Sequence, residues 1–219
     1  MGGGHVDADG AGEVGDRLGR REVPELAAAR GAGALVIEDD YDSEFRYDVA
    51  PVPALAALDR DRVAYLGTTS KTDAPSMRLG WLVAPPGLHR AILERREITH
   101  DVPAWPVQRA FVSLLRDGYV DQVVRSARRT YAARARRVTE ALRPLATPIL
   151  PVAGMYATIP LPKARALRVR ASAREAGFEV PLLRDYCRTA QLSGVIIGFG
   201  GCTDAELDRA LAAVVRGLG

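Results

Sequence analysis

The sequence contains little cysteine and histidine and has no long apolar run. Its 219 residues include two cysteines and three histidines, too few for a disulfide framework or a metal cluster. No apolar stretch approaches the ~20 residues of a membrane-spanning helix, and the first residues lack the charged and then apolar order of a signal peptide. These absences argue against disulfide-rich, metal-stabilised and membrane-spanning classes. They predict a cytoplasmic protein with no metal site and no membrane partner.

Lysine is also scarce, although basic residues are not. The chain has 30 Lys+Arg against 27 Asp+Glu, a net charge of +3, which is no signature of nucleic-acid binding. Only two of the basic residues, Lys71 and Lys163, are lysines. Arginine can replace lysine as a positive charge but not as a nucleophilic amine. Each lysine is therefore a candidate for amine chemistry, although Lys163, at the start of an expected helix, is expected to be exposed.

Composition divides the chain into a tail and two expected domains. Residues 1–20 are rich in glycine, show no apolar periodicity and are expected to be mobile. In residues 21–118, short apolar runs separated by helical segments predict an α/β layer whose buried strands form a parallel sheet. The expected strands cover 34–37, 63–66 and 79–84, and the expected helices cover 23–30, 88–96 and 106–116.

Residues 119–219 are expected to form a long connecting helix and a small α+β domain. Apolar residues at three- and four-residue spacing predict a helix over 119–142, with arginines on a solvated face. Thr203 and Glu206 form a capping-box pattern that predicts the start of the last helix. The other expected elements are strands at 155–161, 178–181 and 195–199 and a helix at 163–176.

A cluster of acids, the segment EDDYD at 38–42, ends the first expected strand. Neighbouring carboxylates repel one another and need a cation or solvent nearby. In open α/β sheets, ligands bind just beyond the carboxyl ends of the strands. The segment is therefore a place where a cofactor with a basic nitrogen could bind.

A second polar segment, GTTSKTDAPSMRLG at 67–80, follows the second expected strand. Hydroxyl groups and the guanidinium of Arg78 suit a phosphate, and the amine of Lys71 can form a Schiff base with an aldehyde. Together the two segments offer an acid, a phenol, an amine and phosphate donors. This set matches the needs of pyridoxal phosphate.

The two motifs resemble the aminotransferase-like domain of MocR-type regulators of the GntR family. The likeness rests on VIEDDYDSEFRYD, then GTTSKTDAPSMRLGWLVAP, and continues through PVQRAFVSLLRDGYVDQVVRSARRTYAARARR to the last helix. In these bacterial transcription factors a winged helix-turn-helix is fused to a fold-type I, pyridoxal-phosphate-dependent aminotransferase domain. The resemblance implies an α/β fold: the second half of a fold-type I large domain at 21–118, and a smaller α+β C-terminal domain at 119–219.

The resemblance also implies roles for three residues around the cofactor ring. Lys71 would form the Schiff base with pyridoxal phosphate. Asp39 would pair with the pyridine nitrogen and keep it protonated, and Tyr41 would donate a hydrogen bond to the phenolic oxygen of the ring. The implied partner is an amino acid or a related amine, held near the cofactor.

On the phosphate side, the resemblance implies that Arg78 binds the phosphate with help from Ser70 and Thr68. Two positions depart from the family pattern. Thr69 stands where an aromatic residue is usual, and Asp73 stands where an apolar one is usual.

The family carries a DNA-binding domain and the first half of the cofactor domain upstream of this region. We therefore expect a truncated domain without a DNA-binding part, which by resemblance would form a homodimer. Three functions remain open: an aminotransferase, a catalytically inactive remnant that senses an effector or dimerises, and a nucleic-acid binder that uses the arginines of 125–137. The expected solvated face of the long helix argues against the third.

Overall fold

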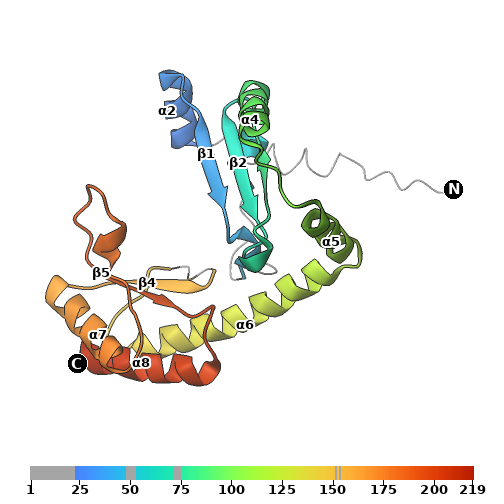
Figure 1. Cartoon of the computed structure of the whole chain (residues 1–219). Coiled ribbons are helices and arrows are strands. Elements are labelled where there is room, and N and C mark those ends of the chain that lie inside the picture. Colours follow the sequence, from blue (N-terminus) through green and yellow to red (C-terminus); the bar gives the residue numbers. More distant parts are fainter. Residues whose placement is uncertain (1–22, 48–52, 72–74, 151, 153) are drawn as a thin grey trace. The chain divides into compact units, whose positions relative to one another are not determined.

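The computed structural model describes residues 23–47, 53–71, 75–150, 152 and 154–219, and these fall into two compact units (Figure 1). Unit 1 comprises the described residues of Met1–Tyr41 and Val52–Asp117, and unit 2 those of Asp42–Pro51 and Gly118–Gly219. The expected mobile tail at 1–20 and Asp73 lie outside the described residues.

Unit 1 contains a three-stranded sheet in the order β1-β2-β3. β1 (Val36–Asp40) and β2 (Val63–Thr68) are parallel, as the sequence predicts. β3 (Gly80–Val83) is antiparallel to β2, so the prediction of an all-parallel sheet is wrong for this strand. A parallel neighbour needs a crossover of a dozen or more residues, usually a helix. The 69–79 connection contains only the one-turn helix η2 (Pro75–Met77) among its described residues, so the chain returns as a hairpin.

The helices of unit 1 begin and end near local signals. α2 (Pro24–Ala32) starts at a proline and ends at Gly33, whose left-handed φ of 63° closes the last turn. α4 (Pro86–Thr99) and α5 (Trp105–Arg116) also have proline in their first turn. The four-residue α3 (Leu55–Leu58) was not expected from the sequence.

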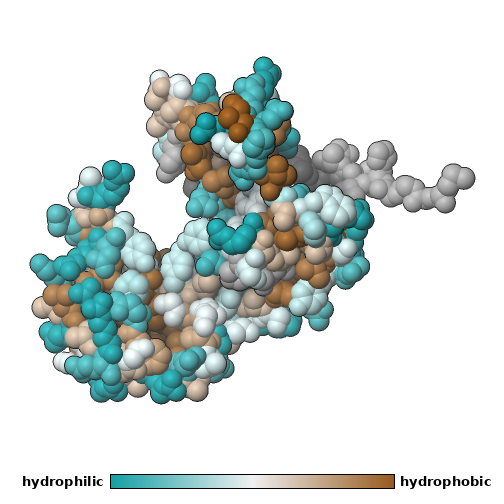
Figure 2. Space-filling model, in the orientation of Figure 1, coloured by the Kyte–Doolittle hydropathy of each residue, from teal (hydrophilic) through white to brown (hydrophobic). Residues whose placement is uncertain are grey.

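The expected burial of the first strand is wrong. β1 alternates between partly buried and exposed residues, and the side chain of Ile37 is 69% exposed. Figure 2 shows apolar residues at the surface of this part of unit 1. The described residues leave one face of β1 open, so its apolar run behaves as a half-covered strand.

Unit 2 has the larger core. α6 (Tyr119–Leu142), α7 (Lys163–Glu175) and α8 (Asp204–Leu218) pack with a pair of antiparallel strands, β4 (Tyr156–Pro160) and β5 (Gly194–Gly198). The short helices η1 (Ser43–Phe45) and η3 (Leu183–Tyr186) complete the unit. Phe45 is fully buried, and its ring meets the edge of Tyr131 on α6 at 5.3 Å between centroids. The core consists of buried side chains that come from several elements, among them Val138, Leu142, Ile159, Val169, Val195, Phe199, Leu207 and Val214.

The expected strand at 178–181 does not form. Its place holds an extended segment joined to β5 by the bridge Leu182–Val195 and by one bond from the Ile196 amide to the Pro181 carbonyl, 2.9 Å long. Proline has no N–H to donate to a sheet ladder, so Pro181 limits this segment to an edge contact.

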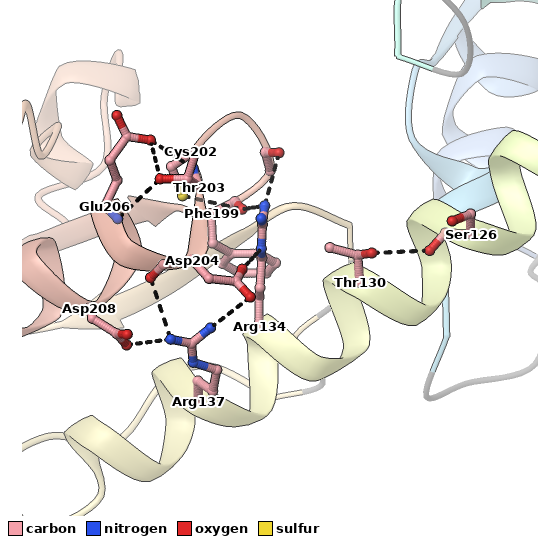
Figure 3. Close-up of polar contacts among 11 residues, drawn as sticks. Ser126, Thr130, Arg134, Arg137, Phe199, Cys202, Thr203, Asp204, Glu206 and Asp208 are labelled. Carbon is pink, nitrogen blue, oxygen red and sulfur yellow. Dashed lines mark hydrogen bonds and ion pairs between the residues drawn. The ribbon is translucent and has the colours of Figure 1, made fainter.

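Two arginines of α6 link that helix to the start of α8 (Figure 3). Arg134 Nε lies 2.9 Å from Asp204 Oδ1, and its Nη1 donates to the Phe199 carbonyl at 2.9 Å. Arg137 pairs with Asp204 and Asp208. These two arginines are therefore part of the packing of unit 2, whereas Arg125 and Arg129 lie on the exposed face that the sequence predicts.

The capping box of α8 is confirmed. The Thr203 side chain accepts a bond from the Glu206 amide, and the Glu206 carboxylate accepts one from the Thr203 amide at 2.7 Å. Lys163 is exposed, as the sequence predicts, and Cys187 and Cys202 are partly buried. Within the part of the chain that the structure describes, no helix is long and apolar enough to cross a membrane, and no cluster of ligating side chains could hold a metal ion.

Candidate functional site

The sheet of unit 1 brings the two polar segments of the sequence to one edge. β1 and β2 are parallel, so their carboxyl ends lie together, with Asp39 opposite Leu66 and Asp40 opposite Gly67 (Figure 1). β3 runs back from the same edge, where Gly80 pairs with Thr68. The backbone therefore places 39–41, 68–71 and 78 at the same end of the sheet.

The strand geometry separates the acids of the first segment. The Glu38 carboxylate accepts bonds from the first amides of α3, from Leu55 at 2.9 Å and from Ala56 at 3.1 Å. Asp40 accepts a 2.8 Å bond from the hydroxyl of Tyr65. Successive side chains of a strand point to opposite faces, so Asp39 lies on the other face from both. It is exposed and has no hydrogen bond or ion pair with another described residue.

The hydroxyl residues of the second segment are already in contact. Thr68 Oγ1 donates to Ser70 Oγ at 3.0 Å, and the Ser70 amide donates to Thr68 Oγ1 at 3.1 Å. Lys71 follows in an exposed turn, and Tyr41 is exposed at the end of β1. Lys71 and Asp39 lie at the same end of the sheet, and they form no ion pair with each other.

Arg78 has an unusual backbone conformation. Its φ is 49°, in the left-handed region that non-glycine residues adopt only at a cost. Its exposed guanidinium forms no hydrogen bond or ion pair with the described residues. A guanidinium at the same end of the sheet as two hydroxyl groups suits a phosphate.

Two features of this edge were not found from the sequence. Trp81 on β3 covers Gly67 of β2, and a Cβ at Gly67 would lie 2.2 Å from the indole ring. The only signal was the glycine itself, directly after the apolar run of the expected strand. The second is Thr69, the one fully buried polar side chain among the described residues.

A separate hollow of about 220 Å³ lies in unit 2. Asp42 and Arg46 line it together with Tyr156 and Thr158. A Cβ on Gly154, whose φ is 69°, would lie 2.7 Å from Asp42 Oδ2, so this position needs glycine. One acid and one arginine in a small hollow suit a zwitterion. Arg184 and Arg188 are exposed arginines elsewhere in the unit, and Arg184 Nε lies 3.6 Å from Asp185 Oδ1.

No family model matches the chain, but comparison with individual proteins finds transcriptional regulators that are similar to it. The pyridoxine biosynthesis transcriptional regulator PdxR of Corynebacterium glutamicum is 33% identical over 197 residues, 89% of this chain and 43% of that protein. The probable rhizopine catabolism regulatory protein MocR of Rhizobium meliloti is 33% identical over 175 residues, 77% of this chain and 36% of that protein. The chain is homologous to the MocR-type regulators. It spans less than half the length of these MocR-type relatives.

Solved structures show the same fold. A kynurenine aminotransferase of Pyrococcus horikoshii superposes with a TM-score of 0.78 at 24% identity, over 88% of this chain and 50% of that one. The α-aminoadipate aminotransferase LysN of Thermus thermophilus gives 0.75 at 20% identity, over 99% and 55%. The chain therefore has the fold of part of a fold-type I aminotransferase, as the resemblance implies for MocR-type proteins.

Proposed function

We propose that this chain is part of a pyridoxal-phosphate-binding, aminotransferase-like domain of a MocR-type regulator, with the cofactor at the sheet edge of unit 1. One observation carries the proposal: the edge holds an amine, hydroxyl groups, a guanidinium and an acid that has no partner among the described residues. The cofactor, when bound, supplies an aldehyde and an electron-withdrawing ring.

The ring side of the proposed site uses three residues. Lys71 contributes the amine that condenses with the aldehyde. Asp39 accepts a hydrogen bond from the protonated ring nitrogen, and a carboxylate at that place raises the pKa of the nitrogen. Tyr41, at the exposed end of β1, donates to the phenolic oxygen. The structural roles of Glu38 and Asp40 support the choice of Asp39 among the acids.

The phosphate side uses the second segment. The fork of Arg78 contributes charge-assisted bonds, and Ser70 and Thr68 add hydroxyl donors from positions where they already contact each other.

We further propose that the protein responds to an amino compound and, as a separate proposal within unit 2, that the hollow of this unit holds the charged groups of a zwitterion. Arg46 would hold a carboxylate and Asp42 an ammonium group. The regulator homology favours sensing, and the fold of the structural neighbours favours amino-group transfer. The proposal includes a cytoplasmic homodimer, which the exposed apolar side chains of Val102, Trp105 and Leu115 in unit 1 support.

A cofactor titration tests the proposal. Pyridoxal phosphate added to the purified chain should produce an absorbance band distinct from that of the free aldehyde, and Lys71→Ala should abolish it while Lys163→Ala retains it. Absence of the band with the native chain would overturn the proposal. Calorimetry with amino acids beside a transamination assay then separates the two modes: binding without turnover supports sensing, and turnover supports an enzyme.

A further inference from the structure

Thr69 is a buried polar residue that lies in the sequence between Thr68 and Ser70, the two hydroxyl residues of the proposed phosphate side. Its side chain is completely buried, whereas Ser70 and Lys71, the next residues along the chain, reach the surface. A buried hydroxyl needs a hydrogen-bond partner, and its cost is high if the partner is lost. The partner of Thr69 therefore indicates what the residue does.

Thr69 binds the far end of its own loop twice. Its amide donates to the Leu79 carbonyl at 3.0 Å, and its Oγ1 donates to the same oxygen at 2.9 Å. Thr69 follows β2 directly and Leu79 precedes β3 directly. The two bonds therefore close the connection that carries Lys71 near its start and Arg78 at its end.

The Leu79 carbonyl, which accepts both bonds from Thr69, is next to the strained backbone of Arg78. Arg78, with its φ of 49°, immediately precedes Leu79, whose carbonyl accepts both bonds. A strained conformation persists only where the surrounding structure holds it. Fixing the Leu79 carbonyl limits how the preceding residue can relax, so Thr69 is placed to hold the Arg78 guanidinium where the phosphate would bind.

We propose that Thr69 is a positioning residue, which through its hydroxyl bond to Leu79 holds Lys71 and Arg78, at the two described ends of the connection, in their cofactor-binding positions. This inference rests on the function proposed above. It also gives a role to a position at which the chain departs from the pattern of the family it resembles.

Two substitutions separate the hydroxyl from the shape of the side chain. Thr69→Val keeps the branched form and the amide bond but removes the Oγ1 bond, whereas Thr69→Ser keeps the hydroxyl. Loss of one buried hydrogen bond corresponds to about a fivefold change in an equilibrium. We expect Thr69→Val to raise the Kd for pyridoxal phosphate about fivefold, and Thr69→Ser to leave it near the native value.

A second measurement needs no cofactor. An arginine-specific endoproteinase does not cut after Lys71 in the same loop, so its cut between Arg78 and Leu79 reports opening of the loop at the bond itself. Cleavage after the exposed Arg188 of unit 2 provides the internal reference. Relative to that reference, Thr69→Val should be cut at Arg78 about fivefold faster, and Thr69→Ser at the native rate.

The outcomes are distinguishable. If the native chain binds pyridoxal phosphate and Thr69→Val binds it equally well, the positioning role is overturned. If the native chain binds none, the function proposal fails, and the cleavage rates alone decide whether Thr69 holds the loop: a faster cut in Thr69→Val supports this, and an unchanged rate overturns it. Restoration of both affinity and protection by serine supports the inference in full.

Discussion

At the residue scale, adjacent acids in one strand have different roles. Glu38 binds the start of α3 and Asp40 binds Tyr65, while Asp39 faces the other side of the sheet. The resemblance of the motif implies Asp39 as the cofactor residue. The structural roles of its neighbours could not be predicted, because they depend on contacts with residues 17 and 25 positions away.

A pair of conservative substitutions tests this division. Glu38→Gln should lower the stability of unit 1, because Glu38 accepts one helix amide on each carboxylate oxygen, whereas glutamine keeps one acceptor oxygen and turns an NH2 donor toward the other amide. Hydrogen bonds to charged groups contribute roughly 1.5–3 kcal/mol. Asp39→Asn should leave stability nearly unchanged and weaken pyridoxal phosphate binding. Thermal unfolding and cofactor titration of both variants measure this. Equal effects of the two variants on both properties would contradict the assignment.

Gly67 shows how one missing side chain permits close packing. A Cβ there would overlap the Trp81 ring, so Gly67→Ala forces the indole or the strand to move. Overpacking of this kind costs about 1–3 kcal/mol, and a fall in Tm would measure it. Gly31→Ala is the matched control, because nothing lies within 4 Å of that position and alanine favours the helix that contains it. If Gly67→Ala is as stable as Gly31→Ala, Trp81 does not pack as described.

At the element scale, the sequence predicted best those elements that have local signals. Pro24 and Gly33 bound α2, and the Thr203–Glu206 pair begins α8. The direction of β3 and the loss of a strand at 178–181 were missed because strand pairing is decided between segments. α3 was missed because it is short and because the residue that accepts bonds from its first amides, Glu38, lies on β1, 17 positions away.

The start of α8 makes a prediction about pH. Hydrogen bonds from the Thr203 amide and hydroxyl lower the pKa of Glu206 from its ordinary value of 4.5. A lowered pKa in the folded state means that the carboxylate stabilises the fold above pH 4.5, and that this contribution is lost as pH falls through the lower, folded pKa. The Tm difference between native protein and Glu206→Gln should therefore be constant near neutrality and shrink in acid.

The control for this measurement is Glu175→Gln, at an exposed glutamate of α7 without a hydrogen bond to another described residue. Its Tm difference from the native protein should be small at every pH. A Glu206→Gln difference that stays constant down to strong acid would mean that the carboxylate makes no capping contribution.

At the scale of the whole molecule, the two units differ in how well their described residues cover their apolar side chains. Unit 2 has a core built from three helices and a strand pair, while β1 of unit 1 leaves apolar side chains such as Leu35 and Ile37 exposed. The sequence predicted buried strands because apolar runs are typical of covered sheets. The run itself carries no information about what covers it.

The candidate site was predictable at the same scale only in outline. Two polar segments that follow two strands meet at one sheet edge, a consequence of parallel pairing that the sequence pattern anticipates. The part played by Thr69 was not predictable, because its partner is a backbone carbonyl ten residues away. The roles of Lys71 and its neighbours stay predictions.

The scarcity of lysine allows the most direct test of the proposal that Lys71 binds pyridoxal phosphate. The chain has only Lys71 and Lys163 as side-chain amines, and both are exposed. Incubation with pyridoxal phosphate, reduction with borohydride and peptide mass mapping would show which amine the cofactor selects. We predict a pyridoxyl group on Lys71 at cofactor concentrations that leave Lys163 unmodified. Equal labelling of the two lysines, or labelling of Lys163 first, would contradict it.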